Sequence, residues 1–420
     1  MGDSAFLSPQ GGLQLPRRID VGELQLSMYE SLFPSEIAAL RDLSERLKGV
    51  RVLHINATPY GGGVSELLRS IVPMERALGI DSSWIVISGD ERFFNVTKSF
   101  HNALQGDTYK LTPTDKETYL AYNKLNADAL TEDYDFIFVH DPQPVAIRHM
   151  RPSTKARWIW RCHIDTSNPN PQVWQFLLPF IHDYDAVIFT MREFVPEGIT
   201  GRVDIIPPGI DPLSPKNMEL PEDISRHILN WVGAPKDGPI ICQVSRFDPW
   251  KDPLGVIAAY RLIAKEKPDV RLILIGSMAL DDPQGWEIYD KIIKAKNKGN
   301  IHIFTNFMGV ADIQVNAFQR VADVVIQKSK KEGFGLVVSE TLWKGTPIVA
   351  GRAGGIPMQL AGGGGFLVDS VEETAKRALE VLDNPGPAAE EGRRGRRYIR
   401  EHFLIMRLIK DHLNLLLSLA

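Results

Sequence analysis

The sequence predicts an α/β protein of two domains, each built on a parallel sheet that helices cover on both faces. Short, continuously apolar strands alternate with amphipathic stretches of helical period along most of the chain. This alternation is typical of a parallel sheet buried on both faces. The chain has 420 residues, and a single hydrophobic core stops growing at roughly 250–300 residues, so two domains are expected.

The α/β pattern of the first half begins with a β-branched strand at residues 50–56, followed by a run of three glycines, Gly61 to Gly63. Apolar residues at helical spacing predict a helix over residues 64–78. The further strands of this half are short and rich in apolar or aromatic residues, and they are expected at 84–88, 136–140, 158–162, 186–189 and 205–206.

A segment with three prolines and a glycine, residues 207–212, stands at the middle of the chain and predicts a domain linker. We therefore expect an N-terminal domain at residues 1–207 and a C-terminal domain at 208–400. In the second half, helices are expected at 253–265 and 285–296. The strands of this half are expected at 240–244, 271–275, 301–304, 324–327 and 348–350.

The last segment, residues 393–419, alternates basic and apolar positions at helical spacing. Such a helix can lie on a membrane surface. We prefer the interpretation that it bridges the two domains, with residues 401–420 packing back on the N-terminal domain.

Composition excludes several classes of protein. Apolar residues make up 44% and charged residues 24%, as in a folded globular protein. Lys and Arg (48) nearly balance Asp and Glu (52), which gives a net charge of −4. The chain therefore lacks the excess of basic residues that is typical of a nucleic-acid binder. The only two cysteines, Cys162 and Cys242, exclude a disulfide framework. With no apolar run of about 18 residues and no signal peptide, we expect a cytoplasmic protein without a membrane partner.

Ligands of parallel α/β sheets bind at the carboxyl ends of the strands, so residues that follow strands are the first candidates for a site. Gly62 and Gly63 follow the first strand and precede a helix, where backbone N–H groups can face an anion. The run is not GxGxxG, because Val64, Ser65 and Glu66 follow it. A tight turn without a ligand therefore stays equally open.

Two cations follow the first strand of the second half. Arg246 and Lys251 lie five residues apart in a loop that Pro249 and Trp250 stiffen. An arginine fork and a lysine point charge at the end of a strand can neutralise a diphosphate. A pair of solvated surface cations is the alternative.

The sharpest motif follows the expected strand at 324–327. Gly333 and Gly335 leave backbone N–H groups uncovered at the start of a helix, a site suited to phosphate or sugar oxygens. Glu332 stands at the edge of this turn and Glu340 about one turn into the helix. Either glutamate alone could serve only the helix dipole.

In the first half, Asp141 and His163 directly follow two strands of the same expected sheet. Both should therefore point at one site, where His163 could carry a proton or donate a hydrogen bond. Gln143 and Asp165 lie nearby and could supply hydrogen bonds to a sugar.

The motifs described above resemble those of a known family. Glu332 and Glu340 match the E-x7-E motif of retaining GT-B glycosyltransferases of the glycogen-synthase-like type, family GT4. The chain is most similar to the trehalose glycosyltransferring synthases, from about Val50 to Phe403. The runs that carry this resemblance are GGGVSE, FFNVTKSFHNALQG, VHDPQP, WRCHID, PPGID, SRFDPWKD, DDPQGW, TNFMGV, VNAFQR, EGFGL and GGI.

The resemblance implies a GT-B fold, with two Rossmann-like domains facing a deep cleft. The N-terminal domain would bind the acceptor and the C-terminal domain the nucleotide-sugar. Of the catalytic residues, Arg246 and Lys251 would hold the diphosphate of the donor. Glu332 would bind hydroxyls of the donor glucose, and His163 would lie near the reacting centre.

The remaining roles also follow from the resemblance. Glu340 would bind the ribose of the nucleotide, and residues 306–309, with Met308, would border the base. Asp141 and Gln143 would contact the acceptor sugar. Backbone groups complete the donor site, and they belong to Gly62, Gly63, Gly333, Phe334, Gly335 and Leu336.

The implied reaction is glucosyl transfer from UDP- or ADP-glucose to glucose with retention of configuration, giving α,α-trehalose, with reversal left open. Trehalose phosphorylase or another GT4 transferase is the alternative. A nicotinamide-dependent dehydrogenase lacks support because GxGxxG is missing, and a nucleotide-sugar sensor would carry the same loops. No Asp-x-Asp metal motif stands out, so no metal is expected to be required, although Mg²⁺ on the diphosphate stays open. Relatives suggest a homodimer.

Overall fold

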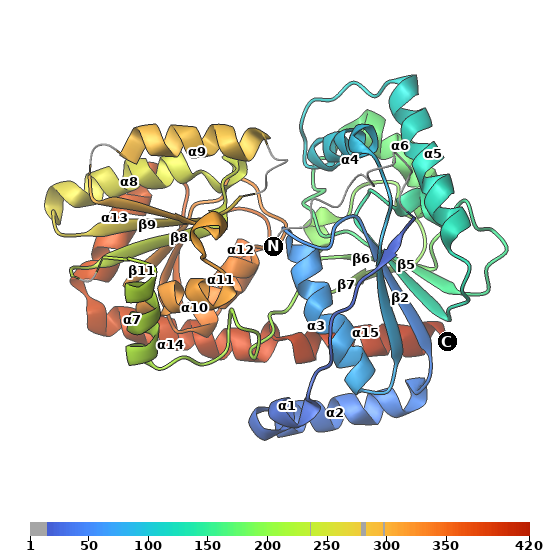
Figure 1. The fold of residues 1–420 in the computed structure, drawn as a ribbon, viewed down its shortest axis with the longest axis horizontal. Helices are drawn as coiled ribbons and strands as arrows, with labels where there is room; N and C mark the ends of the chain where they lie inside the picture. The colour runs from blue at the N-terminus through green and yellow to red at the C-terminus, as the bar shows by residue number, and fades with distance from the viewer. Residues whose placement is uncertain (1–14, 236, 279–282, 297–298) are drawn as a thin grey trace. The chain divides into compact units, whose positions relative to one another are not determined.

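The computed structural model describes residues 15–235, 237–278, 283–296 and 299–420. The chain forms two compact units. The first contains the chain up to Pro208 together with Met406–Ala420, and the second contains Gly209–Ile405. The change of unit falls inside the proline-rich segment at residues 207–212. Each unit is an α/β structure with its own sheet (Figure 1).

The sheet of the first unit has the strand order β1-β3-β2-β4-β5-β6-β7. All neighbouring strands are parallel except β1, which runs antiparallel to β3. The strands are β1 Arg17–Arg18, β2 Arg51–Asn56, β3 Asp81–Val86, β4 Phe136–His140, β5 Arg157–Arg161, β6 Ala186–Phe189 and β7 Val203–Ile205. β4 and β6 have the predicted bounds. β3 begins three residues before the prediction, because the buried Ser82 and Ser83 belong to it although their polarity argued against a strand.

Helices cover both faces of this sheet (Figure 1). They are α1 Leu26–Leu32, α2 Pro34–Ser44, α3 Gly63–Ala77, α4 Glu91–Leu104, α5 Pro113–Ala129, α6 Pro171–Ile181 and α15 Ile405–Leu419. The start of α5 shows why the sequence begins a helix there. Thr112 and Asp115 form a capping box around Pro113, whose missing N–H costs nothing at the first helical position.

The sheet of the second unit is parallel throughout, in the order β10-β9-β8-β11-β12-β13. Its strands are β8 Ile240–Arg246, β9 Arg271–Ser277, β10 Ile301–Thr305, β11 Val324–Gln327, β12 Ile348–Gly351 and β13 Gly365–Val368. Its helices are α7 Glu222–Trp231, α8 Pro253–Glu266, α9 Pro283–Lys296, α10 Asp312–Val321, α11 Leu336–Trp343, α12 Ile356–Gln359, α13 Val371–Asp383 and α14 Pro385–His402. α8, α9 and α13 lie on one face of the sheet, and α7, α10 and α11 lie on the other (Figure 1).

The four glycines at residues 362–365 lead into β13, a strand that the sequence did not reveal. A Cβ at Gly364 would lie 2.8 Å from Cα of Gly395, and a Cβ at Gly365 would lie 1.9 Å from the carbonyl oxygen of Ile348. Glycine is therefore required here because the backbone packs directly against α14 and β12.

The segment 393–419, expected as one helix, is two. α14 ends at His402 and α15 begins at Ile405, because Leu404 pairs with Ile210 in an isolated β-bridge. The apolar side of α15 is buried, as the packing interpretation requires. Within the described residues, no helix is long and apolar enough to cross a membrane.

Candidate functional site

Each sheet has a topological switch point, and the predicted site residues gather at these two places. In the second unit β8 lies between β9 and β11. The chain first continues on one side of β8, through β9 and β10, and then crosses to the other side at β11. In the first unit β2 stands in the same way between β3 and β4. Open parallel sheets bind their ligands in the crevice that such a reversal leaves outside the carboxyl ends of the strands.

The two cations that follow β8 lie in different environments. The guanidinium of Arg246 is half exposed and donates to Asp248 at 3.1 Å. Asp248 also accepts the backbone N–H of Trp250 at 2.7 Å, which fixes the turn Pro249–Lys251. Lys251 is more enclosed, with 18% of its side chain exposed. The structure thus keeps both cations at the carboxyl end of β8 but turns Lys251 inward.

Lys251 meets the motif that follows β11. Its Nζ donates to Oε2 of Glu332 at 2.5 Å, and the hydroxyl of Ser329 donates to the same oxygen at 3.2 Å. A second contact joins the loops, since the backbone N–H of Lys330 donates to the carbonyl of Trp250 at 2.7 Å. The loops that follow two neighbouring strands therefore form one site.

The glycine turn at the start of α11 is shaped by Glu332. Gly335 has a φ of +84°, and a Cβ on it would lie 3.1 Å from Cγ of Glu332. Gly354 comes still closer, because a Cβ there would lie 1.7 Å from the carbonyl oxygen of Glu332. No side chain caps the N-terminus of α11 at Gly335. The N–H groups at this end of the helix, including that of Leu336, are suited to an anion.

Phe334 contributes only its backbone to this turn. Its side chain is buried and packs on Phe403 with ring centroids 5.5 Å apart. The backbone carbonyl of Gly333 accepts the N–H of Gly355 at 3.0 Å. Residues 354–356 therefore pack against the turn and stabilise its backbone.

Glu340 is a buried carboxylate with an unusual environment. It is 1% exposed, and neither of its carboxylate oxygens has a hydrogen-bond partner among the described residues. The nearest cation is Lys216, whose Nζ lies 3.8 Å from Oε1. A buried polar group without a partner costs free energy, so this carboxylate is suited to accept hydrogen bonds from a ligand.

Met308 follows β10 at the same edge of the sheet and is 56% exposed. The neighbouring Phe307 stacks on Trp286, with centroids 5.9 Å apart. Part of the DDPQGW run falls at 279–282, outside the described residues.

In the first unit, Asp141 and His163 lie together as the sheet order requires, since β4 and β5 are neighbours. Oδ1 of Asp141 accepts the backbone N–H of His163 at 2.8 Å. Burial raises the pKa of Asp141 to about 7, although the His163 N–H and Arg161 oppose the shift. Its φ of +63° is rare outside glycine and places strain at this position.

Gln143 and Asp165 lie close along the chain but differ in what they offer. Oε1 of Gln143 is buried and has no hydrogen-bond partner among the described residues. One carboxylate oxygen of Asp165 already accepts both the N–H and the hydroxyl of Ser167. Gln143 is therefore the better placed of the two for a ligand.

The glycine loop after β2 has room for a ligand. Gly62 is in an extended conformation, and a Cβ on it would meet nothing within 4 Å. The protein itself thus does not require glycine at this position. Gly63 begins α3, whose N-terminus has no side-chain cap. An anion could approach these backbone N–H groups closely.

Sequence reasoning missed a row of buried polar residues behind His163. They come from β2, α3, β4 and α15, and they are His54, Glu75, His140 and His412. The available signal was a histidine at a buried position of each of two apolar strands, VLHIN and FIFVH. Lys216, the cation nearest Glu340, was missed because it lies in a loop far along the chain.

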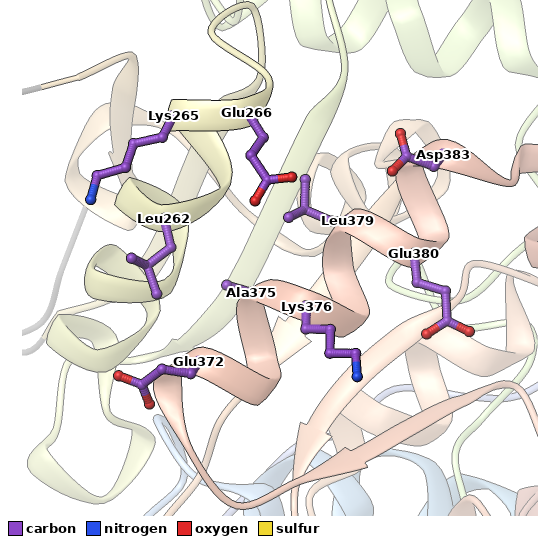
Figure 2. Close-up of a pocket in the computed structure, with 9 residues that line it drawn as sticks. All are labelled: Leu262, Lys265, Glu266, Glu372, Ala375, Lys376, Leu379, Glu380 and Asp383. Carbon is purple, nitrogen blue, oxygen red and sulfur yellow. The ribbon is translucent and has the colours of Figure 1, made fainter.

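Another feature of the second unit lies away from this site. A hollow between α8 and α13 is lined mainly by charged side chains such as Lys265, Glu266 and Glu372 (Figure 2). All nine of its lining residues lie on these two helices and not in the loops that follow β8 and β11. In the described ranges, no three His, Cys, Asp or Glu side chains are grouped so as to hold a metal ion.

Comparison with known proteins agrees with this geometry. Residues 54–196 match the sequence profile of the family described as trehalose synthase, N-terminal domain, and residues 227–401 match glycosyl transferases group 1. The trehalose synthase of Rubrobacter xylanophilus is 50% identical over 411 residues, which span 96% of this chain and 99% of that protein. The trehalose phosphorylase of Pleurotus pulmonarius is 29% identical over 373 residues, which span 76% of this chain and 50% of that protein.

Among solved structures, the α,α-trehalose-phosphate synthase (UDP-forming) from Burkholderia xenovorans matches with a TM-score of 0.71 and 17% identity. The match covers 88% of this chain and 100% of that one, and it confirms the expected GT-B fold. High identity over nearly the full length of a trehalose synthase shows the family as well. The chain belongs to the trehalose synthase family of glycosyltransferases.

Proposed function

We propose that the protein is a retaining glucosyltransferase that forms α,α-trehalose from a nucleotide-glucose, UDP- or ADP-glucose, and glucose, and that it also catalyses the reverse reaction. The trehalose synthases that match this chain along nearly their whole length support the product. The residues at the two switch points support a separate role for each unit, in which the second unit binds the nucleotide-sugar and the first unit binds the acceptor.

The contact between Lys251 and Glu332 is the observation that carries this proposal. It places a cation and a carboxylate beside an uncapped helix N-terminus, in a loop pair at one switch point. A nucleotide-sugar needs these three features. Its diphosphate takes the cation and the N–H groups, while its sugar hydroxyls donate to the carboxylate.

The chemistry of transfer explains why the cations matter. When the bond between C1 of glucose and the phosphate oxygen breaks, both electrons stay with the diphosphate. Negative charge therefore grows where Lys251 and Arg246 are held ready, and such preorganised charges are worth about 100–1,000-fold in rate each. We propose that the leaving phosphate oxygen takes the proton of the acceptor hydroxyl, which attacks the same face of the sugar.

The acceptor is assigned to Asp141 and Gln143. Asp141 is held by the His163 N–H, and Gln143 keeps a buried amide oxygen without a partner among the described residues. Both can accept hydrogen bonds from the hydroxyls of glucose. The partly exposed His163 lies between this pair of residues and the donor sugar in the proposed reaction.

A product assay tests the proposal. The protein is incubated with glucose and with UDP-, ADP- or GDP-glucose in turn, and the disaccharide is identified by NMR. We expect α,α-linked trehalose and one equivalent of nucleoside diphosphate with at least one donor. Formation of no disaccharide with any donor, or of a β-linkage, would refute the proposal.

A further inference from the structure

A continuous row of polar side chains runs through the first unit and ends at His163. We call it the histidine chain, and its members in order are Arg161, His412, Glu75, His54, His140 and His163. All are buried except His163, which is partly exposed. The neighbouring rings of His54, His140 and His163 are also stacked. The chain therefore connects the site to the interior of the unit.

The inner end of the histidine chain fixes one tautomer. Nη1 of Arg161 lies 2.8 Å from Nε2 of His412. A guanidinium can only donate, so Nε2 of His412 must accept and its hydrogen must be on Nδ1. Burial lowers the pKa of His412 to about 4, which agrees with a neutral ring. Its Nδ1 faces Oε1 of Glu75 at 3.9 Å, a distance longer than a hydrogen bond.

Glu75 determines which atom donates in the remaining hydrogen bonds of the histidine chain. Its Oε2 accepts the hydroxyl of Ser82 at 2.6 Å and lies 3.0 Å from Nε2 of His54. Burial alone would raise the pKa of Glu75, but His54 and His412 bring it down to about 2. An ionised carboxylate can only accept, so Nε2 of His54 carries a hydrogen.

The donor and acceptor nitrogens of the other rings follow one after another. If His54 is neutral, its Nδ1 accepts, and among the described residues the donor within reach is Nε2 of His140 at 3.1 Å. Nδ1 of His140 must then accept from Nε2 of His163 at 2.9 Å. His163 is left with its hydrogen pointing inward on Nε2. In the described part of the chain, this is the one hydrogen bond that the ring of His163 makes, so its Nδ1 is left for a ligand.

Charge favours this neutral state over its mirror image. One added proton, held by His54 as an imidazolium, would reverse the two hydrogen bonds between the rings and turn Nδ1 of His163 into a donor. The charge of Glu75 is already balanced by Arg161 across His412, so this second buried cation would leave the row with a net positive charge. Burial lowers the pKa of His140 and His163 well below the usual range, and the positive charge of Arg161 adds to the shift.

We propose that Glu75, His54 and His140 are positioning residues that hold His163 as a neutral imidazole whose Nδ1 offers the donor sugar only a hydrogen-bond acceptor. The proposal rests on the function proposed above, in which His163 lies against that sugar. Positive charge develops on the glucosyl ring as its bond to phosphate breaks. An acceptor nitrogen there stabilises the transition state, whereas an N–H would destabilise it.

The tautomers can be measured directly in the intact wild-type protein. Histidine labelled with ¹⁵N reports by NMR which ring nitrogen carries hydrogen, and single histidine-to-glutamine variants assign the signals. At pH 7.5 we expect hydrogen on Nε2 of His54, His140 and His163, and on Nδ1 of His412. Hydrogen on Nδ1 of His163, alone or on both nitrogens, would overturn the proposal. This measurement needs no substrate, so it stands apart from the assay for trehalose.

The variant Glu75→Gln separates positioning from packing. The amide has nearly the same shape but can donate as well as accept, so the direction of the chain is no longer set. We expect a mixture of tautomers at His163 and a fall in kcat of at least about tenfold, with KM values within about threefold. Ile71→Val, one turn earlier on the same buried side of α3, is the control for lost stability.

The two variants give opposite outcomes if the proposal holds. Ile71→Val should leave both the tautomers and kcat unchanged. An unchanged His163 tautomer in Glu75→Gln, or an equal fall in kcat in both variants at matched melting temperature, would overturn the proposal. If the wild type makes no trehalose, the proposed function fails, and the tautomer pattern still decides whether the histidine chain has this direction.

Discussion

The Nζ atom of Lys251 lies 2.5 Å from Oε2 of Glu332, although 81 positions separate the two residues in the sequence. β8 and β11 are neighbours in the sheet, so the loops that follow them meet at their carboxyl ends. In the function proposed above, these two groups of opposite charge serve the two halves of a nucleotide-sugar, the lysine its diphosphate and the carboxylate its sugar. Binding would exchange their mutual contact for contacts with phosphate and with hydroxyls.

Lys251→Ala should abolish most of the turnover while the protein stays folded. Removing one preorganised charge from a leaving group costs about 100–1,000-fold in kcat. The measurement is trehalose formation at saturating donor and glucose, with circular dichroism to check the fold. Lys291→Ala, which removes a lysine from an exposed ion pair with Glu287 on α9, is the matched control and should keep full turnover. A loss of less than tenfold would exclude the proposed role.

Glu340→Met should stabilise the protein and weaken nucleotide binding at once. The carboxylate is buried without a hydrogen-bond partner among the described residues, and Lys216, 3.8 Å from it, keeps a second carboxylate partner in Asp312. Replacing such a charge by an apolar side chain of similar length is worth about 1–2 kcal/mol. In a unit of this size, each kcal/mol raises Tm by about 2–4 °C. Calorimetry gives both Tm and the Kd for UDP or ADP. If Tm fell and Kd stayed the same, Glu340 would be a structural residue.

Asp141→Asn should stabilise the protein more at pH 8 than at pH 5. The folded-state pKa of Asp141 is raised to about 7, above the ordinary value of 3.8 for an aspartate, so the folded state binds the proton more tightly. The contribution of the protonated Asp141 to the free energy of unfolding is therefore present at low pH and is lost as pH rises through about 7. Asn keeps an oxygen for the His163 N–H and tolerates a positive φ. Equal gains in Tm at both pH values would contradict the raised pKa.

Turnover should survive removal of divalent metal. In the proposed function Arg246 and Lys251 supply the cations for the diphosphate, and among the described residues no cluster suited to a metal ion is present. We expect rates with EDTA to stay within about threefold of those with Mg²⁺, a change that is small beside the effect of one missing charge. A complete loss with EDTA that Mg²⁺ restores would show that the protein's own cations do not suffice.

The sequence predicts the strands from β2 to β12 and the edge at which the site forms, because apolar runs depend on local pattern, whereas β1 and β13 carry no such run. β4, β6 and β11 have the predicted bounds. The same reasoning places Asp141 beside His163, since both follow strands of one sheet. It cannot predict that Lys251 turns inward to Glu332 while Arg246 pairs with Asp248, because those contacts depend on loop geometry.

The histidine chain could not be predicted for a different reason. His54 and His140 interrupt apolar strands, and such residues are usually satisfied by a nearby backbone group. Their actual partners come from elements far apart in the sequence, as the 86 positions between His54 and His140 show. Only the packed fold shows which buried polar groups satisfy one another.

The most direct test of the central claim, that the leaving group is a nucleoside diphosphate, runs the reaction backwards. The protein is incubated with trehalose and either UDP, ADP or inorganic phosphate, and the products are identified by ³¹P NMR. We predict nucleotide-glucose with UDP or ADP, no glucose 1-phosphate with phosphate, and loss of the product in Lys251→Ala. Glucose 1-phosphate formed only with inorganic phosphate would contradict the account and identify a trehalose phosphorylase.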